Sequence, residues 1–241
     1  MSANPTAAMI VIGDEILSGR TRDSNMHFLA GELTRVGIDL REVRVVADDR
    51  DAIVAAVNAV RAEFDTVFTS GGIGPTHDDI TADCIAAAFG VGIDVRADAR
   101  AILQAHYDRS GTVLNEARLR MARIPDGAAL IENPVSSAPG FTLGNVHVMA
   151  GVPSVFQAMV ASVLPTLTGG APLLSQSYRI DRGEGDIAGP LGELAQAYPD
   201  LMIGSYPFQK DGIYGANIVI RGQDGAGVSA AMVALAKLFP A

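Results

Sequence analysis

Three glycines and two neighbouring carboxylates lie within one segment of the sequence, residues 69–81, which reads TSGGIGPTHDDIT. Glycines allow a backbone to turn sharply and to bring its N–H groups close to a ligand. A helical pattern follows from Ala82 to Phe89, and a helix N-terminus adds unpaired donors and a partial positive charge. A junction of this kind between a strand and a helix holds phosphate without needing a lysine.

The same segment also has a purely structural interpretation. Thr76 and Asp79 have the spacing of a helix capping box, with Asp in place of Glu. A Gly-Gly pair alone can form a tight turn, and no Gly-x-x-x-x-Gly-Lys phosphate loop occurs in the chain. The residues alone therefore leave ligand binding and turn formation open.

A second acidic loop follows an earlier strand. Residues 6–12 form an apolar run that predicts a buried strand, and Gly13, Asp14 and Glu15 come directly after it. Because the carboxyl ends of parallel strands open onto one edge of a sheet, this loop and segment 69–81 should face one site. Acidic side chains gathered there are better explained by a divalent cation such as Mg²⁺ than by a merely solvated surface.

The elements around these loops alternate between strand and helix. Strands are predicted at 6–12, 38–46 and 66–69, with helices at 24–36, 51–64 and 82–89 between and after them. Short connections and this alternation predict an α/β fold, a three-layer α/β/α sandwich with a mostly parallel sheet. We expect it to occupy residues 1–168. Its later part should be mostly helical over 97–123, with short strands at 128–131, 141–143 and 146–149 and a helix at 154–167.

The pattern changes after the breaker-rich segment 168–172. A small α+β domain is predicted for residues 172–241. Its expected elements are strands at 174–182, 201–207 and 213–221 and helices at 187–197 and 228–239.

Four ordered blocks within residues 9–160 resemble the signature blocks of the molybdopterin-binding (MoCF-type) domain family, and in particular its CinA-like members. These blocks are 12–19 with 23–25, then 69–81, 133–141 and 150–154. The resemblance implies a site for a phosphorylated pterin or a nucleotide. The ligand-binding residues that it implies are Gly13, Glu15, Asn25, Ser70, Gly71, Gly72, Gly74, Pro75, Thr76, Asn133, Gly140, Gly151 and Pro153.

The CinA-like form implies a metal-dependent hydrolase that splits a nucleoside diphosphate of the ADP-ribose type. Asp14, Asp78 and Asp79 are then the catalytic residues, and Asp14 and Asp79 are the ligands of Mg²⁺, Mn²⁺ or Co²⁺. The alternative is a non-catalytic molybdopterin-binding module linked to molybdenum cofactor metabolism. Relatives also imply a homo-oligomer, either a dimer or a trimer.

Two departures from the relatives point in opposite directions. Asp78 stands where molybdopterin adenylyltransferases typically have arginine, which favours the hydrolase. Val155 stands where CinA-like relatives usually have glutamate, which favours the binding module. The chain also ends where CinA-like proteins continue into a deamidase domain, so we expect that activity to be absent.

Composition narrows the class of protein. The formal net charge is −9 and the only lysines are Lys210 and Lys237, so a nucleic-acid partner is not expected. No apolar run is long enough to span a membrane, and no secretory signal precedes the first apolar segment. One cysteine, Cys84, excludes an internal disulfide. We expect a cytoplasmic protein whose partner is a small phosphorylated ligand.

Overall fold

The first apolar run forms strand β1 (Thr6–Ile12) in a computed structural model that describes residues 4–210 and 212–240. Both faces of β1 are buried. Ala8 and Ile10 point into one hydrophobic core, and Ala7 and Met9 point into another on the opposite face. A strand covered on both sides has no polar face, which explains why this run is continuously apolar.

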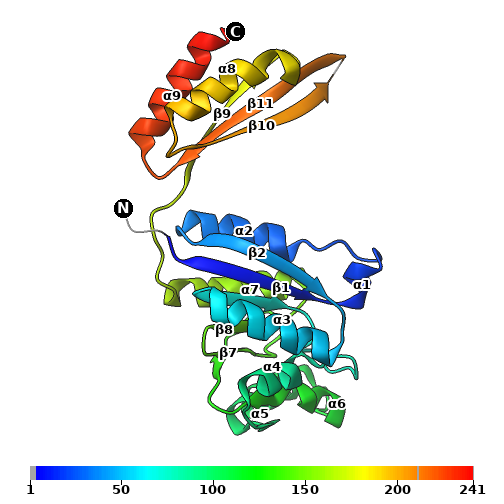
Figure 1. Ribbon diagram of the computed structural model, residues 1–241. Helices are drawn as coiled ribbons and strands as arrows, with labels where there is room; N and C mark the ends of the chain where they lie inside the picture. The colour runs from blue at the N-terminus through cyan, green and yellow to red at the C-terminus, as the bar shows by residue number, and fades with distance from the viewer. Residues whose placement is uncertain (1–3, 211, 241) are drawn as a thin grey trace. The chain divides into compact units, whose positions relative to one another are not determined.

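A six-stranded sheet is built around β1, in the order β2-β1-β3-β8-β7-β6 (Figure 1). Strands β2, β1, β3 and β8 are parallel, whereas β7 and β6 complete one side as antiparallel strands. The bounds are β2 (Asp39–Val46), β3 (Thr66–Ser70), β6 (Ala129–Ile131), β7 (Gly140–Leu143) and β8 (Val146–Met149). The predicted α/β fold with a mostly parallel sheet is confirmed.

Helices cover both faces of this sheet. On one face, α2 (Asn25–Arg35) and α7 (Pro153–Val163) contribute Leu29 and Phe156 to the core. On the other face, α3 (Arg50–Glu63) and α4 (Thr81–Phe89) contribute Val57 and Ile85. A 3-10 turn, η2 (Leu164–Thr166), follows α7. The three layers hold the strand ends, and therefore the loops beyond them, in fixed positions.

The segment between α4 and β6 forms a small substructure that the sequence only partly predicted. Its elements are β4 (Ile93–Val95), α5 (Ala97–Ser110), α6 (Glu116–Leu119), η1 (Arg120–Ala122) and β5 (Arg123–Pro125). The expected helical content is present in α5 and α6. The antiparallel β4–β5 pair was not predicted, because strands of three residues are too short to show a periodicity.

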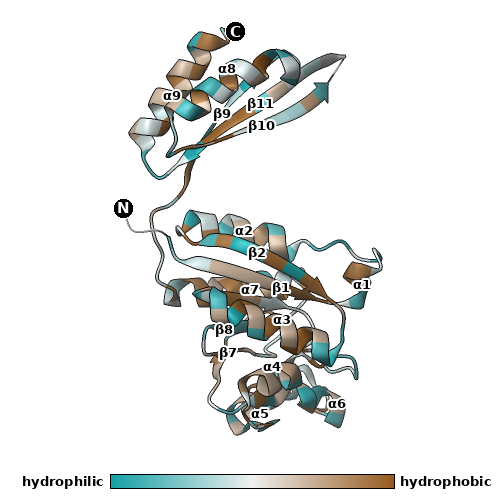
Figure 2. Ribbon diagram, viewed as in Figure 1, coloured by the Kyte–Doolittle hydropathy of each residue, from teal (hydrophilic) through white to brown (hydrophobic). Residues whose placement is uncertain are grey.

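Strand β2 lies at the edge of the sheet and is half exposed, as its sequence predicted. Figure 2 shows hydrophilic and hydrophobic bands that alternate along it. Val43 and Val45 are exposed, and charged side chains of the same strand form the ion pairs Arg44–Glu42 and Arg41–Asp39.

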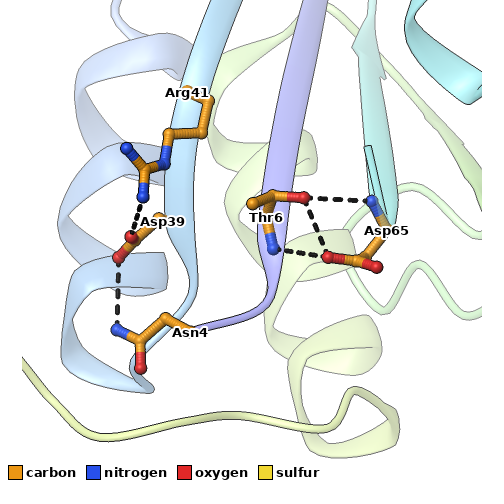
Figure 3. Close-up of polar contacts among 5 residues, drawn as sticks. All are labelled: Asn4, Thr6, Asp39, Arg41 and Asp65. Atoms are coloured by element: carbon orange, nitrogen blue, oxygen red, sulfur yellow. Dashed lines mark hydrogen bonds and ion pairs between the residues drawn. The ribbon is translucent and has the colours of Figure 1, made fainter. Parts of the chain in front are cut away.

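The amino ends of the strands carry carboxylates that all have partners (Figure 3). Asp65 accepts hydrogen bonds from the backbone N–H and the hydroxyl of Thr6, both at 2.8 Å. Asp39 accepts from Asn4 Nδ2 at 3.2 Å and from Arg41 Nη2 at 2.8 Å. Both carboxylates at this edge of the sheet therefore have hydrogen-bond donors within the protein.

The chain divides into two compact units between Gly170 and Ala171. In the second unit, an antiparallel sheet of order β10-β11-β9 packs against two helices around a core that includes Ile218 and Leu235. The elements are β9 (Leu174–Ile180), α8 (Glu184–Ala197), β10 (Met202–Lys210), β11 (Ile213–Gly222) and α9 (Gly225–Leu238). No helix in the described part of the chain is long and apolar enough to cross a membrane.

Candidate functional site

An open cleft of about 530 Å³ lies at the carboxyl ends of the parallel strands. Its walls come from the loops that follow β1, β2, β3 and β8, together with residues 133–138 that lead into β7. Because these loops leave neighbouring parallel strands at the same edge, residues far apart in sequence meet in one place. The predicted site and this cleft coincide in position.

The first two glycines of the loop after β3 adopt backbone conformations that other residues rarely adopt. The φ angles of Gly71 and Gly72 are +112° and +68°. A Cβ atom on Gly71 would lie 2.2 Å from the Ile12 carbonyl oxygen, and one on Gly72 would lie 2.1 Å from Thr81 Oγ1. Glycine is therefore required at both positions by conformation and by space.

This loop leaves backbone donors free. The Gly71 N–H donates to the Met149 carbonyl at 3.1 Å, which fixes the start of the loop. The N–H groups of Gly72, Ile73 and Gly74 donate to no group in the described part of the chain. Consecutive free N–H groups beside a cleft are suited to the oxygens of an anion.

Asp79 is held within the loop as well as lining the cleft. Its Oδ2 accepts from the Thr76 N–H at 2.8 Å and from the Thr76 hydroxyl at 2.5 Å. The helix α4 begins only at Thr81, so the predicted capping-box pair closes a turn before the helix and does not cap it. Oδ1 of Asp79 makes no hydrogen bond within the described residues, and one oxygen therefore remains for a ligand.

Asp48, which the sequence analysis missed, adds another carboxylate to the cleft. It follows β2 and accepts a hydrogen bond from the Asp14 N–H at 2.9 Å. Burial raises the pKa of Asp48, the Asp14 N–H partly opposes this, and the carboxylates of Asp14, Glu15 and Asp78 raise it further. The carboxyl edge thus gathers like charges that interact with one another. Asp48 could have been predicted from its position just after a strand, because the same rule identified the other two loops.

Most of the residues predicted for the site line the cleft. They are Gly13, Glu15, Gly71, Gly72, Gly74, Pro75, Asp78, Asp79, Asn133, Gly151 and Pro153. Lining residues that were not predicted are Ile12, Thr21, Asp48, Ile73, Met121, Ser136, Ala138, Ala150, Val152 and Val155. These are mainly apolar, and apolar residues carry no sequence signal that separates a cleft wall from a core.

The other predicted residues lie outside the cleft lining: Asp14, Asn25, Ser70, Thr76 and Gly140. Asn25 is buried and donates through Nδ2 to Ser70 Oγ and to the Gly151 carbonyl, both at 2.8 Å. It therefore ties the end of β3 to the loop after β8. Gly140 is a packing position, since a Cβ atom there would lie 2.4 Å from the Val148 carbonyl oxygen.

The predicted metal ligands do not form a resident metal site. The part of the chain that the structure describes has no group of three or more His, Cys, Asp or Glu side chains able to hold a metal ion. Asp79 lines the cleft, whereas Asp14 is exposed and does not. The described side chains therefore do not by themselves supply a complete set of ligands for a divalent cation.

Comparison with known proteins places the chain in a family. A family model described as "Probable molybdopterin binding domain" matches residues 8–169, more than half of the chain. The chain belongs to this molybdopterin-binding family. A second model, described as "FAD synthase, middle domain", matches residues 172–241.

Individual relatives and a solved structure are similar to the chain over two thirds or more of its length. A protein of Aeropyrum pernix is 36% identical over 171 residues, which cover 69% of this chain and 64% of that protein. A "Probable FAD synthase" of Caenorhabditis elegans is 31% identical over 264 residues, covering 99% of this chain and 51% of the relative. The chain thus spans less than two thirds of each.

The protein CinA of unknown function from Thermoplasma acidophilum, whose crystal structure is known, is 36% identical in sequence. It covers 68% of this chain and 99% of the CinA chain, with a TM-score of 0.63. The first unit is therefore a CinA-type domain of the molybdopterin-binding family.

Proposed function

We propose that the cleft binds a nucleoside diphosphate ligand of the ADP-ribose type as its complex with a divalent cation, and hydrolyses the diphosphate. The observation that carries this proposal is the meeting of two kinds of group in one cleft. The free N–H groups of Gly72, Ile73 and Gly74 lie on the same walls as the carboxylates of Asp48 and Asp79. N–H groups stabilise phosphate oxygens, and carboxylates accept protons or bind hard cations.

The reaction in this proposal is attack of water on one phosphorus atom of the diphosphate. A new P–O bond forms to the water oxygen, the bridging P–O bond breaks, and AMP and ribose 5-phosphate leave. Asp48 is suited to accept the proton of the water, because its raised pKa makes it a stronger base than an ordinary carboxylate. The loop N–H groups are suited to the charge that develops on the phosphoryl oxygens.

The cation in this proposal arrives with the ligand. Mg²⁺ is commonly held by one or two carboxylates together with phosphate oxygens, so it does not need a group of three protein ligands. Asp79, with Oδ1 free, and Asp78 would then hold it against the diphosphate. Asp14 lies outside the cleft lining. It would contribute only through its negative charge, which raises the pKa of Asp48.

FAD is a second substrate to be tested. The nematode relative carries the name of an enzyme that makes FAD, and FAD contains the same ADP half as ADP-ribose. A cleft of about 530 Å³ with apolar walls is large enough for part of such a dinucleotide.

The second candidate function is a non-catalytic module that binds molybdopterin or a related phosphorylated pterin. Membership of the molybdopterin-binding family supports it. Val155 also supports it, because this side chain lines the cleft where CinA-like relatives usually have a carboxylate.

One assay separates these functions. The protein is incubated with ADP-ribose, FAD or NAD⁺ in the presence of Mg²⁺, Mn²⁺ or Co²⁺, and nucleoside monophosphate release is measured with and without a chelator. Release that requires the cation supports the hydrolase. A protein that binds phosphorylated pterin but releases no product from any of these substrates would be the binding module.

We also propose that the chain forms a dimer or a trimer, as relatives in the family imply. Light scattering would give a mass of two or three times 25.0 kDa, and a 25.0 kDa species at every working concentration would contradict it.

A further inference from the structure

A small pocket of about 20 Å³ adjoins the main cleft at the glycine loop. Both spaces are lined by Gly72, Ile73, Gly74, Asp79 and Met121. The pocket has room for about one water molecule or one ligand oxygen. An atom that enters it would lie next to the loop whose N–H groups are free.

Arg120 lines this pocket, and its guanidinium makes few hydrogen bonds within the described part of the protein. Its Nη2 donates to the Asp79 carbonyl at 3.4 Å, a long contact. Its Nε is buried and has no hydrogen-bond partner in the described part of the chain. A buried guanidinium donor without an acceptor is costly, so its presence beside a cleft calls for a ligand acceptor.

The neighbouring arginines Arg118 and Arg123 have interaction partners within the protein. Arg123 makes two hydrogen bonds to the Asp83 carboxylate, at 2.7 and 2.6 Å. Arg118 donates to the Val113 carbonyl and lies over the ring of Tyr107 at 5.0 Å. Arg120 differs from both because, among the residues that the structure describes, its guanidinium pairs with no carboxylate and lies over no aromatic ring.

The acidic lining of the cleft suggests a use for the unpaired charge of Arg120. The ionisable side chains that line the cleft are all acidic: Glu15, Asp48, Asp78 and Asp79. An anionic ligand meets an unfavourable field there, and Arg120 supplies a cation in the pocket beside the loop on which the anion would sit. Planar guanidinium donors are also well suited to phosphate oxygens.

We infer that Arg120 is the anion-binding residue of this site, and that its free guanidinium donors bind a phosphate oxygen of a ligand seated on the Gly72–Gly74 loop. This inference deepens the proposed function and rests on its placing of a diphosphate at that loop. The short turn η1 thereby contributes to a site whose other residues come from the strand ends.

The test measures the binding of inorganic pyrophosphate with Mg²⁺ by calorimetry, which does not depend on turnover. Arg120→Gln should weaken binding roughly 10- to 100-fold, and Arg120→Lys should weaken it less, since a charge remains without the planar donors. Arg118→Gln is the matched control, because it removes an arginine two residues away that points to Tyr107, and it should bind as the wild type does.

Two further readouts separate anion binding from a structural role. The melting temperature of Arg120→Gln should stay at or above that of the wild type, because the change removes an unsatisfied buried donor. In the hydrolysis assay, this variant should raise KM for ADP-ribose while binding of adenosine, which has no phosphate, stays unchanged.

The outcomes for Arg120 and for the hydrolase are distinct. Pyrophosphate affinity that is equal in the wild type and Arg120→Gln, or absent from the wild type, overturns the assignment of Arg120. Arginine-dependent pyrophosphate binding without hydrolysis of any diphosphate upholds Arg120 and refutes the hydrolase. Hydrolysis that Arg120→Gln leaves unchanged refutes Arg120 alone.

Discussion

Asp65 and Asp48 lie at opposite ends of the large sheet, and the pKa values of their carboxyl groups are shifted in opposite directions. At the amino end, the N–H and hydroxyl of Thr6 bind Asp65 and lower its pKa (Figure 3). At the carboxyl end, burial and three neighbouring carboxylates raise the pKa of Asp48. The first arrangement favours the charged form of the side chain, and the second opposes it.

The backbone shows the same contrast. At the amino ends of β1 and β2 the N–H groups of Thr6 and Asp39 both donate hydrogen bonds, while the loop after β3 contains Gly71 and Gly72 at positive φ and leaves donors free. Crowded like charges and backbone strain both cost stability. Their concentration at one edge, where the cleft lies, indicates that this edge is shaped for a ligand and the other for the fold.

The largest effect should come from Gly71→Ala. The new Cβ would lie 2.2 Å from the backbone oxygen of Ile12 at a φ of +112°. Since a backbone atom of β1, a strand paired on both sides, cannot easily move aside, we expect a loss of about 3 kcal/mol or more of unfolding free energy. Thermal unfolding should show Tm falling by roughly 6–12 °C.

The matched control is Gly185→Ala in the second unit. Gly185 lies in α8 with no heavy atom near its would-be Cβ, so alanine should leave Tm unchanged or slightly higher. Equal Tm values for both variants would show that the glycine loop is not strained, and the contrast between the two edges would lose its backbone argument.

The next effect concerns Asp79→Asn and activity. Asn can still accept the two hydrogen bonds from Thr76, so the turn should survive at a cost of at most about 1 kcal/mol. Loss of the negative charge should reduce cation-dependent hydrolysis of ADP-ribose by a factor of roughly 100 or more. Tm and turnover are measured on the same preparation.

An unchanged turnover in this variant, beside an active wild type, would reduce Asp79 to a turn-forming residue. The catalytic role would then belong to other carboxylates of the cleft, and Asp48 and Asp78 would be the next side chains to change.

Much of the fold was predictable because its elements are long and regular. The run at 6–12 has both faces buried, and β2 alternates as an edge strand should. The short β4–β5 pair was not predictable, and neither was the single turn of helix α1 (Asp14–Leu17), because three or four residues do not establish a period.

The site was predictable where glycine or a carboxylate directly followed a strand. The same rule was not applied to Asp48, which follows β2. Arg120 could not be found this way at all, since it lies in a turn far along the chain and only tertiary packing brings it to the glycine loop. Distant contributions of this kind leave no local spacing in a sequence.

A smaller effect, on stability, should come from Asp48→Asn. Because the pKa of Asp48 is raised by folding, the folded protein binds this proton more tightly than the unfolded chain does, and stability falls as pH rises across that interval. Removing the charge should therefore stabilise the protein at pH 7 by about 0.5 kcal/mol, while Asn still accepts from Asp14. The gain should vanish as pH falls below the ordinary value of 3.8. A lower Tm for the variant at pH 7 would contradict this account of the carboxyl edge.

The smallest effect, and the opposite sign, should come from Asp65→Asn at the amino end. Its pKa is lowered by folding, so the charged form adds stability that is fully present above pH 3.8 and is lost as pH falls through the folded pKa. Asn keeps an acceptor for Thr6 but loses the charge, and since Asp65 is exposed, Tm at pH 7 should fall only slightly. Unfolding curves from pH 2 to 7 for both variants should therefore shift in opposite directions at neutral pH and converge on the wild type in acid. Shifts of the same sign at pH 7 would contradict the opposite pKa shifts of Asp48 and Asp65.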